Sequence, residues 1–248
     1  MKISIITATF NSESTIETAI QSVANQTYSE IEHIIIDGGS TDNTLSIIEQ
    51  NKAKISKVIS EPDEGIYDAL NKGIKLATGN LIAFLHADDF YANENSIKNS
   101  IELLKNKNTD SVYADLQYVS KDDVTKVVRN WVSGDFSYNQ LKKGWMPPHP
   151  TFIVKKEAYE KYGYFNTNFK IAADYDLVLR FLGEHKISTT YLPEIIIKMR
   201  VGGASNRSLK NIIQKSKEDL KALRTNKVGG IFSLFYKNIS KIPQFFTK

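Results

Sequence analysis

The chain has 248 residues, of which 41% are hydrophobic, so it can bury a substantial core within one α/β domain. Its 32 basic and 28 acidic residues leave a formal net charge of +4, which is too small to indicate a nucleic-acid partner. The absence of cysteine excludes disulfides and thiolate metal ligands, and no apolar run reaches the roughly 18 residues of a transmembrane helix.

Charge is distributed unevenly along the chain. Residues 205–248 contain ten Lys and Arg against two Asp and Glu, a balance of +8, whereas residues 1–204 carry −4. This asymmetry predicts a slightly acidic main domain over 1–204 and a basic appendage over 205–248.

The first 90 residues alternate between short β-branched runs and amphipathic stretches, a pattern typical of βαβ units around a parallel sheet. Strands are expected at Lys2–Thr9, Glu32–Asp37, Lys57–Ser60 and Leu81–Leu85. Helices are expected after Asn11–Ser14, after Ser40–Asp42 and over Ile66–Ala77, where apolar residues recur at helical spacing.

Polar residues cluster where three of these strands end, at Thr9–Asn11, Asp37–Asp42 and His86–Asp89. Right-handed crossovers place the carboxyl ends of parallel strands on one edge of the sheet, which is where open α/β sheets bind ligands. We therefore expect the three clusters to lie close together.

Beyond residue 110 the strands become longer and crossover helices fewer, which predicts an antiparallel extension of the same sheet. The expected elements are strands at Ser111–Val119, Lys126–Trp131, Thr151–Lys155 and through Ile195–Met199, and helices at Lys156–Tyr162 and Asp174–Gly183. The predicted fold class is α/β, with a mostly parallel sheet covered by helices on both faces and a helical C-terminal tail.

Asp88 and Asp89 are adjacent carboxylates directly after a buried apolar run. Hard cations such as Mg²⁺ and Mn²⁺ prefer oxygen ligands and are often held by one or two carboxylates together with substrate phosphates. A solvated turn or a helix cap is the alternative interpretation of the pair.

Two further acidic positions have both a functional and a structural interpretation. Asp37 precedes Gly38 and Gly39, which allow close approach of a ligand to the backbone, although a capped helix after a tight turn uses the same residues. Asp174 begins a predicted helix, where a carboxylate can be a general base or an ordinary partner of the helix dipole.

Six segments, taken in order, resemble the family 2 inverting glycosyltransferases with the GT-A fold, a Rossmann-like architecture. The resemblance covers Lys2–Ser205, and its matching segments are Ile5–Asn11, Ser22–Thr27, Ile36–Thr44, Ala77–Gly79, Leu85–Asp89 and Ala173–Arg180. The segment Ser60–Gly73 and the variant Asp37-Gly38-Gly39 resemble a bacterial branch that builds O-antigen and related surface polysaccharides.

The resemblance implies a site that holds a nucleoside-diphosphate sugar and a Mn²⁺ or Mg²⁺ ion. Asp174 matches the catalytic base of the family, and Asp89 matches the residue that binds the cation bridging the two phosphates. Asp88 is expected on the metal or on the ribose. The other residues expected to bind the nucleotide sugar are Thr9, Phe10, which would stack on the base, Asp37 and Asp63.

The chain departs from the family pattern at three places. Gly38 stands where many members have a second aspartate that contacts the base, and Asp63 is expected to substitute for it. Leu70 replaces a frequent arginine, and Ala173 replaces an acidic neighbour of the base. Asp176, about 200° around the helix from Asp174, should point away from the site.

Two other segments could contribute to the same site. His149 lies in the stiff segment Trp145–Pro150 and could reach the acceptor or the metal, although a lone histidine is more often structural. Gly202–Ser205 could close over the diphosphate or form a plain turn.

The predicted function is an inverting hexosyltransferase that acts on a nucleoside-diphosphate sugar and a glycan acceptor, with a polyprenyl-linked glycan as one expected form. A nucleotidyltransferase is an alternative, but residues Thr9–Ser14 lack the glycine-rich phosphate loop that such enzymes carry. A sugar-nucleotide-binding module on the same scaffold is another alternative, against which Asp88, Asp89 and Asp174 argue.

The tail combines lysines with apolar residues at helical intervals, including Leu209, Ile212, Leu220 and Leu223, followed by an aromatic stretch through Ile242–Phe246. Such a basic amphipathic stretch can lie in an anionic membrane interface. We therefore expect a cytoplasmic protein that contacts the inner face of the bacterial cytoplasmic membrane, with a helix packed on the main domain as the alternative.

Overall fold

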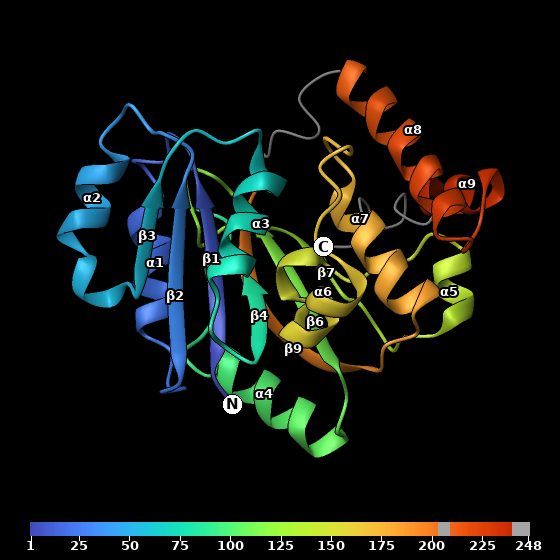
Figure 1. Ribbon diagram of the computed structural model, residues 1–248, viewed down its shortest axis with the longest axis horizontal. Helices are drawn as coiled ribbons and strands as arrows, with labels where there is room; N and C mark the ends of the chain where they lie inside the picture. Colours follow the sequence, from blue (N-terminus) through green and yellow to red (C-terminus); the bar gives the residue numbers. More distant parts are fainter. Residues whose placement is uncertain (203–208, 240–248) are drawn as a thin grey trace.

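The computed structural model describes residues 1–202 and 209–239, and within them nine strands form one mixed sheet in the order β3-β2-β1-β4-β8-β6-β9-β5, with β7 pairing to β6 (Figure 1). The strands are β1 (Ile3–Thr9), β2 (Ile31–Asp37), β3 (Lys57–Ser60), β4 (Leu81–Phe84), β5 (Asp89–Tyr91), β6 (Ser111–Val119), β7 (Val127–Trp131), β8 (Ile153–Lys155) and β9 (Thr189–Arg200).

The first four strands form the predicted parallel half of the sheet. β1 pairs in parallel with β2 and β4, and β2 pairs in parallel with β3. The register places Thr9 opposite Asp37 and Asp37 opposite Ser60, so the carboxyl ends of β1, β2 and β3 are level. The prediction that the polar clusters share one edge is therefore confirmed for these strands.

The predicted extension is antiparallel only in part. β8 runs antiparallel between β4 and β6, and β5 and β7 are antiparallel to their neighbours, but β6 and β9 pair in parallel. The helices between β8 and β9 carry the chain across the sheet, so no tight turn forces β9 to run opposite to its neighbour.

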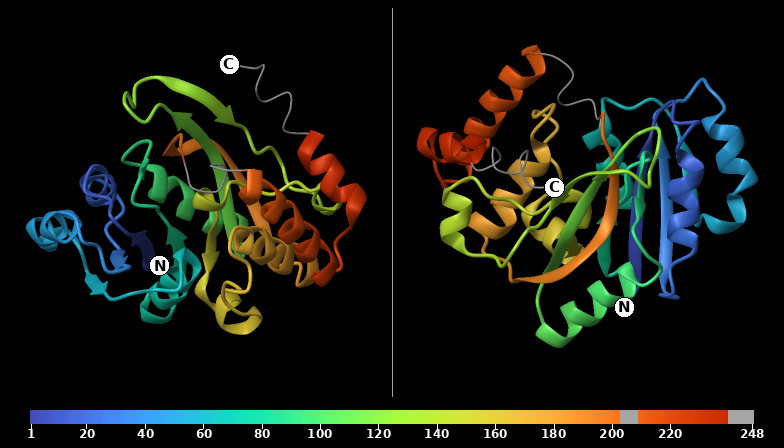
Figure 2. Two further views of the ribbon diagram at one scale, coloured as in Figure 1. Left: turned by 90° about the horizontal axis from the view of Figure 1, so that it is seen from above. Right: turned by 180° about the vertical axis from the view of Figure 1, so that it is seen from behind.

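Helices cover both faces of the sheet, as expected (Figures 1 and 2). On one face α1 (Ile16–Ala24) and α4 (Ser96–Lys107) share a core with β1, β4 and β6, and α2 (Thr44–Gln50) packs beside α1. On the other face α3 (Ile66–Leu76), α6 (Lys156–Tyr162) and α7 (Ala173–Val178) enclose a second core. The remaining helical segments are α5 (Tyr138–Lys142), the single turns Lys52–Lys54 and His149–Thr151, and a wide turn, Leu179–Glu184, that continues α7.

Two helices close the described chain, α8 (Leu209–Thr225) and α9 (Ile231–Ile239), and they pack beside α7 and α5 (Figure 1). Ala222 and Leu223 of α8 and Val228 of the turn between the two helices are buried and belong to the core under α7. The predicted helix beginning at Leu209 is confirmed, while Ile242–Phe246 and residues 203–205 lie outside the described residues. The domain boundary at 204 stays a prediction.

Across residues 1–202 and 209–239, no helix combines the length and the hydropathy needed to traverse a bilayer.

Candidate active site

Thr9 and Phe10 stand at the carboxyl end of β1. The Thr9 side chain is buried and its Oγ1 has no hydrogen-bond partner among the described residues, whereas Phe10 is 60% exposed. An exposed aromatic ring beside an unpaired hydroxyl is suited to stacking against a flat ligand while the hydroxyl donates or accepts a bond. The expected base-stacking role of Phe10 fits this placement and stays a prediction.

Asp37, at the end of β2, is fully buried and organises the loop that follows it. Its Oδ2 accepts hydrogen bonds from the amides of Gly39 (3.1 Å) and Ser40 (3.0 Å) and from Ser60 Oγ (2.7 Å). Its Oδ1 accepts a bond of 2.5 Å from Ser40 Oγ. A direct contact of Asp37 with a nucleotide, as predicted, would require one of these bonds to be exchanged.

Asp63 occupies the space that a side chain at Gly38 would fill. A Cβ atom at Gly38 would lie 2.5 Å from Asp63 Oδ2 and 3.5 Å from Cδ2 of Phe10. The other carboxylate oxygen, Oδ1, accepts a bond of 2.8 Å from the amide of Gly65 and is held in place by it. Asp63 therefore presents its carboxylate beside Phe10, in the space that a side chain at position 38 would fill.

Asp88 and Asp89 differ sharply in their surroundings. Asp88 is exposed, whereas Asp89 is fully buried and neither of its carboxylate oxygens has a hydrogen-bond partner among the described residues. Burial, with a smaller contribution from the charge of Asp88, raises the pKa of the Asp89 carboxyl well above its usual range. Arg200 opposes this shift and donates a bond of 2.6 Å from Nη1 to the carbonyl of Asp88.

The carboxylate oxygens of Asp88 and Asp89 are ligands of the kind that a hard divalent cation prefers. No group of three or more His, Asp or Glu side chains with metal-site geometry occurs within 1–202 and 209–239, so the protein would offer two acidic ligands there. A buried carboxylate with no partner is costly unless a cation compensates its charge. Mg²⁺ and Mn²⁺ sites of this kind are commonly completed by water and substrate phosphates.

Asp174 lies on the first turn of α7, and its charge acts on the same histidine, His86, as the charge of Asp88. Its charge and that of Asp88 both favour the protonated form of His86, although burial dominates and lowers the His86 pKa. Tyr67 Oη lies 3.4 Å from Asp174 Oδ1 and donates a bond of 2.7 Å to the carbonyl of Ile171. The sequence-predicted base and one of the sequence-predicted metal carboxylates therefore both act electrostatically on His86.

His149 belongs to the same cluster. Its ring stacks on Phe84 at 5.2 Å and on His86 at 6.2 Å, and its Nε2 has no hydrogen-bond partner in the described chain. Burial lowers the pKa of His149 to about 4, so the ring is neutral at physiological pH. The structure places His149 next to the site, and its contact with an acceptor or a metal stays a prediction.

Asp176 points away from the site, which confirms the prediction from helical geometry. Its side chain accepts a bond of 2.9 Å from Asn226 and lies 3.4 Å from Nη1 of Arg180. The structure adds three residues that the sequence did not single out, Tyr67, His86 and Arg200. His86 and Tyr67 lie within the matching motifs, but Arg200 on β9 had no local signal.

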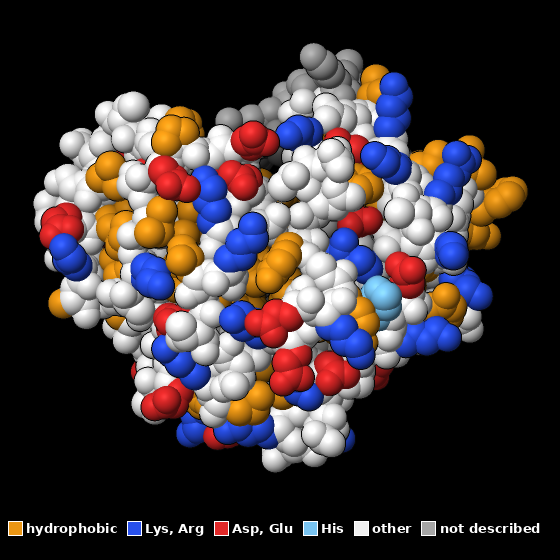
Figure 3. Space-filling view, in the orientation of Figure 1, with side chains coloured by type: hydrophobic (Ala, Val, Ile, Leu, Met, Phe, Trp, Pro, Cys, Tyr) orange, Lys and Arg blue, Asp and Glu red, His pale blue; other side chains and the backbone are white. Residues whose placement is uncertain are grey.

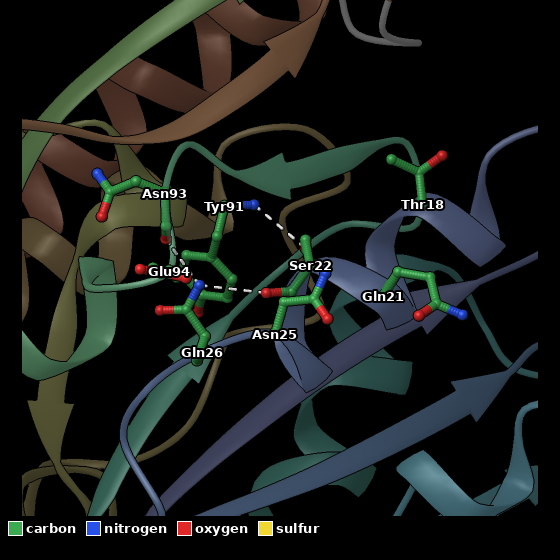
Figure 4. A pocket seen from close by; sticks show the side chains of 8 residues that line it. All are labelled: Thr18, Gln21, Ser22, Asn25, Gln26, Tyr91, Asn93 and Glu94. Atoms are coloured by element: carbon green, nitrogen blue, oxygen red, sulfur yellow. Dashed lines mark hydrogen bonds between the residues drawn. The ribbon is translucent and has the colours of Figure 1, made fainter.

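A separate hollow of about 510 Å³ lies between α1 and β5 (Figure 4). No predicted site residue lines it, and its polar groups already bind one another: Gln26 Nε2 donates to the carbonyls of Ser22 (3.1 Å) and Asn93 (2.8 Å), and the Tyr91 amide donates to Ser22 Oγ (3.2 Å). We attribute this hollow to the packing of α1 against β5.

Two relatives of similar sequence are described as glycosyltransferases. An Escherichia coli protein described as the UDP-Glc:alpha-D-GlcNAc-diphosphoundecaprenol beta-1,3-glucosyltransferase WfaP is 31% identical over 96% of this chain and 93% of its own. A PGL/p-HBAD biosynthesis glycosyltransferase of Mycobacterium bovis is 28% identical over 82% of this chain and 78% of its own.

Two solved structures share the fold, which confirms the predicted GT-A architecture. S. aureus TarS 1–349 in complex with UDP-GlcNAc superposes with a TM-score of 0.70 at 18% identity, over 92% of this chain and 66% of that one. The mannosyltransferase PcManGT of Pyrobaculum calidifontis, in complex with GDP-Man and Mn²⁺, gives 0.69 at 17% identity, over 98% and 70%. The chain spans only 40% of the longer TarS chain.

The sequence model described as Glycosyl transferase family 2 matches residues 4–164. That match covers more than half of the chain and includes Asp37, Asp63, Asp88 and Asp89. This protein therefore belongs to glycosyl transferase family 2.

Proposed function

We propose that this protein is a metal-dependent, inverting hexosyltransferase that moves a sugar from a nucleoside diphosphate to a hydroxyl of a lipid-linked glycan in bacterial surface-polysaccharide synthesis. The observation that carries the proposal is that the charges of Asp174 and Asp88 both act on His86, whose carbonyl accepts a bond of 3.0 Å from the amide of Asp89. The WfaP relative, named for a diphosphoundecaprenol acceptor, supports the lipid-linked glycan.

The nucleotide would lie across the ends of β1 and β2. Phe10, 60% exposed, would stack on the base, and Asp63 beside it would accept a hydrogen bond from the base or ribose. Thr9 directly precedes Phe10 in the sequence, and its unpaired hydroxyl lies at the same strand end. Asp37 would act mainly by holding the loop that carries Gly38 and Gly39.

Asp89 and Asp88 would hold Mn²⁺ or Mg²⁺. A cation bound there supplies positive charge that stabilises the leaving nucleoside diphosphate. Arg200, whose Nη1 donates to the carbonyl of Asp88 and whose charge acts on both carboxylates, would add a second positive charge there. The PcManGT structure, which contains Mn²⁺ and GDP-Man, supports metal use.

Asp174 would accept the proton of the acceptor hydroxyl. As that proton moves to the Asp174 carboxylate, the acceptor oxygen bonds to the anomeric carbon and the bond from this carbon to the diphosphate oxygen breaks. Attack from the face opposite the leaving group inverts the anomeric configuration.

The decisive test is Asp174→Asn, compared with Asp122→Asn at an exposed carboxylate in the turn between β6 and β7. We expect Asp174→Asn to lower the rate of sugar transfer at least 100-fold while donor binding, measured by thermal shift with Mn²⁺, stays within twofold. Asp122→Asn should change neither. Near-normal turnover of Asp174→Asn would refute the base assignment, and donor binding without release of nucleoside diphosphate in the wild type would favour a binding module.

Membrane contact would occur through α9. Five apolar residues on its outer side are exposed, Ile231 (63%), Phe232 (79%), Phe235 (60%), Tyr236 (53%) and Ile239 (44%), and the tail has a balance of +8. Exposed aromatic and aliphatic side chains beside lysines match an anionic lipid surface in both polarity and charge. We place the protein on the inner face of the cytoplasmic membrane, where a lipid-linked acceptor would be within reach.

A further inference from the structure

Glu218 of α8 binds the segment that leads into Asp174. Its carboxylate accepts hydrogen bonds from three consecutive amides, those of Lys170 (3.1 Å), Ile171 (2.8 Å) and Ala172 (3.0 Å). Gln214, one helical turn earlier, donates a bond of 3.0 Å to the same carboxylate. These hydrogen bonds outweigh burial and lower the Glu218 pKa, so the group is ionised at neutral pH.

The peptide groups of Ile171 are therefore held from two elements. Glu218 accepts from its amide, and Tyr67 of α3 donates to its carbonyl at 2.7 Å. The same Tyr67 hydroxyl is 3.4 Å from Asp174 Oδ1. The N-cap residue of α7, Ala172, has no side chain that can cap the helix, and the anionic Glu218 accepts a bond from its amide and places a negative charge near the helix start.

The residues that follow Asp174 are held by the same pair of helices. Lys237 of α9 and Asp219 of α8 form an ion pair of 2.9 Å with side chains only 3% and 5% exposed, and Lys237 Nζ lies 3.1 Å from the ring centre of Tyr175. Asn226, at the end of α8, donates to Asp176 at 2.9 Å. Buried ion pairs rarely add much stability. We therefore attribute the Lys237–Asp219 pair to a positioning role, in which it holds the Tyr175 ring in place through the contact with Lys237.

We propose that α8 and α9 position the catalytic base, with Glu218 as the principal positioning residue. This inference rests on the proposed role of Asp174. Among the described residues, the hydrogen bonds of Glu218 go to residues 170–172 and to Gln214 and none goes to the carboxyl ends of β1, β2 or β4, so Glu218 should affect the chemical step and leave donor binding unchanged. A displacement of the base of the order of 1 Å can cost about 100-fold in rate, so even partial release of the 170–172 segment should be measurable.

The test is Glu218→Gln in the full chain, with Glu157→Gln on the exposed side of α6 as the matched control. The substitution keeps the shape but removes the charge and one acceptor oxygen. With UDP-glucose, UDP-GlcNAc or GDP-mannose as donor and Mn²⁺ present, we expect kcat to fall about tenfold and the donor KM to stay within about twofold. Glu157→Gln should leave both unchanged.

A double-mutant comparison separates positioning from general damage. If Glu218 acts through Asp174, Glu218→Gln should cause no further loss of the residual rate in the Asp174→Asn background. An equal fractional loss in both backgrounds would overturn the positioning role. Near-normal turnover of Asp174→Asn would instead refute the base assignment itself, so the two failures are distinguishable.

Amide hydrogen exchange gives a readout that does not depend on the donor. We expect Glu218→Gln to raise exchange over residues 170–176 at least tenfold while the β1 and β2 amides stay unchanged, and Gln214→Ala to give a smaller increase in the same segment. Unchanged exchange over 170–176 in Glu218→Gln would overturn the proposal, even where none of the three donors supports turnover.

Discussion

Gly73 on α3 packs directly on Ile6 of β1, and a Cβ atom at this position would overlap Ile6 Cγ2. Alanine is favoured over glycine in a helix by about 1 kcal/mol, but forcing an extra methyl group into a packed core costs about 1–3 kcal/mol. We expect Gly73→Ala to lower the free energy of unfolding by about 1 kcal/mol, measured in urea.

The Ile6→Ala background tests this explanation, because it removes the methyl group that a new Cβ would meet. There Gly73→Ala should be neutral or stabilising. The same loss in both backgrounds would show that the contact with Ile6 is not the cause.

Asp63 offers a sharper residue-level test, because its carboxylate lies where a side chain at position 38 would be. We expect Gly38→Asp alone to weaken UDP binding about tenfold, since two carboxylates would compete for one place beside Phe10. The exchange Gly38→Asp with Asp63→Gly should restore most of the affinity, as measured by calorimetry with Mn²⁺.

The exchange restores the arrangement of acidic residues expected for many members of the family. Gln50→Glu at the exposed end of α2 is the control for the one negative charge that Gly38→Asp adds, and the exchange itself leaves the net charge unchanged. If the double variant binds UDP as weakly as Gly38→Asp, Asp63 does not substitute for the missing carboxylate.

Among the elements, β1 to β4 and the helices between them could be predicted because their residues follow the expected periods. The helix spacing of Ile16, Ala19, Ile20 and Val23 matches the buried side of α1 residue for residue. α4 was not predicted because its buried stripe, Ile97, Ile101 and Leu104, is narrow and is surrounded by serines, lysines and asparagines. β5 has only three residues and owes its pairing to β9.

Candidate site residues could be named from the sequence where they follow a strand or begin a helix within a motif. Asp88, Asp89 and Asp174 are of this kind, and their roles stay predictions. Arg200 and Glu218 could not be found in this way, since they reach the site from β9 and α8 after the chain has crossed the sheet. Their partners are 112 and 47 residues away in sequence, so only the packing of elements brings them together.

The pairing of β1 and β2 buries a titratable group, and this gives the two strands a pH dependence. His33 on β2 is 1% exposed, and its Nε2 lies 3.0 Å from Thr7 Oγ1 on β1. Burial lowers the His33 pKa from 6.5 to about 4. Between these values the unfolded chain binds a proton that the folded chain does not, so stability falls as the pH drops from 6.5 to about 4.

We expect His33 to account for up to about 3 kcal/mol of this acid loss. His33→Gln should be less stable than the wild type at pH 7.5, because packing is lost, but the difference should shrink or reverse at pH 4.5. Urea unfolding of both proteins at the two pH values measures this difference in the free energy of unfolding. His149, whose pKa is also lowered to about 4, leaves a residual slope in the variant. A difference that is the same at both pH values would contradict the assignment to His33.

At the scale of the whole molecule, the exposed hydrophobic surface of α9 stands out. Hydrophobic side chains gather at the end of the molecule occupied by α9, beside Lys and Arg side chains (Figure 3). The inner side of the same helix carries Lys237, which is buried under Tyr175. α9 thus presents one side to α7 and the other to the surroundings, so a surface bound there would lie close to the helix that carries Asp174.

This arrangement predicts that the full chain binds vesicles containing phosphatidylglycerol and that the outer side of α9 is responsible. Replacing Phe232 and Phe235 with serine removes two of its most exposed rings, and we expect binding to fall at least tenfold, because each ring contributes about 1.5–3 kcal/mol when buried in the interface. The matched control replaces Val127 and Val132 with serine. These two residues, in and next to β7, are 49% and 70% exposed, and the control should bind normally.

Binding should also weaken with added salt, since the lysines attract the anionic lipid within a Debye length of about 10 Å. Full binding by the double serine variant, or equal binding to pure phosphatidylcholine vesicles, would exclude α9 as a site for an anionic membrane.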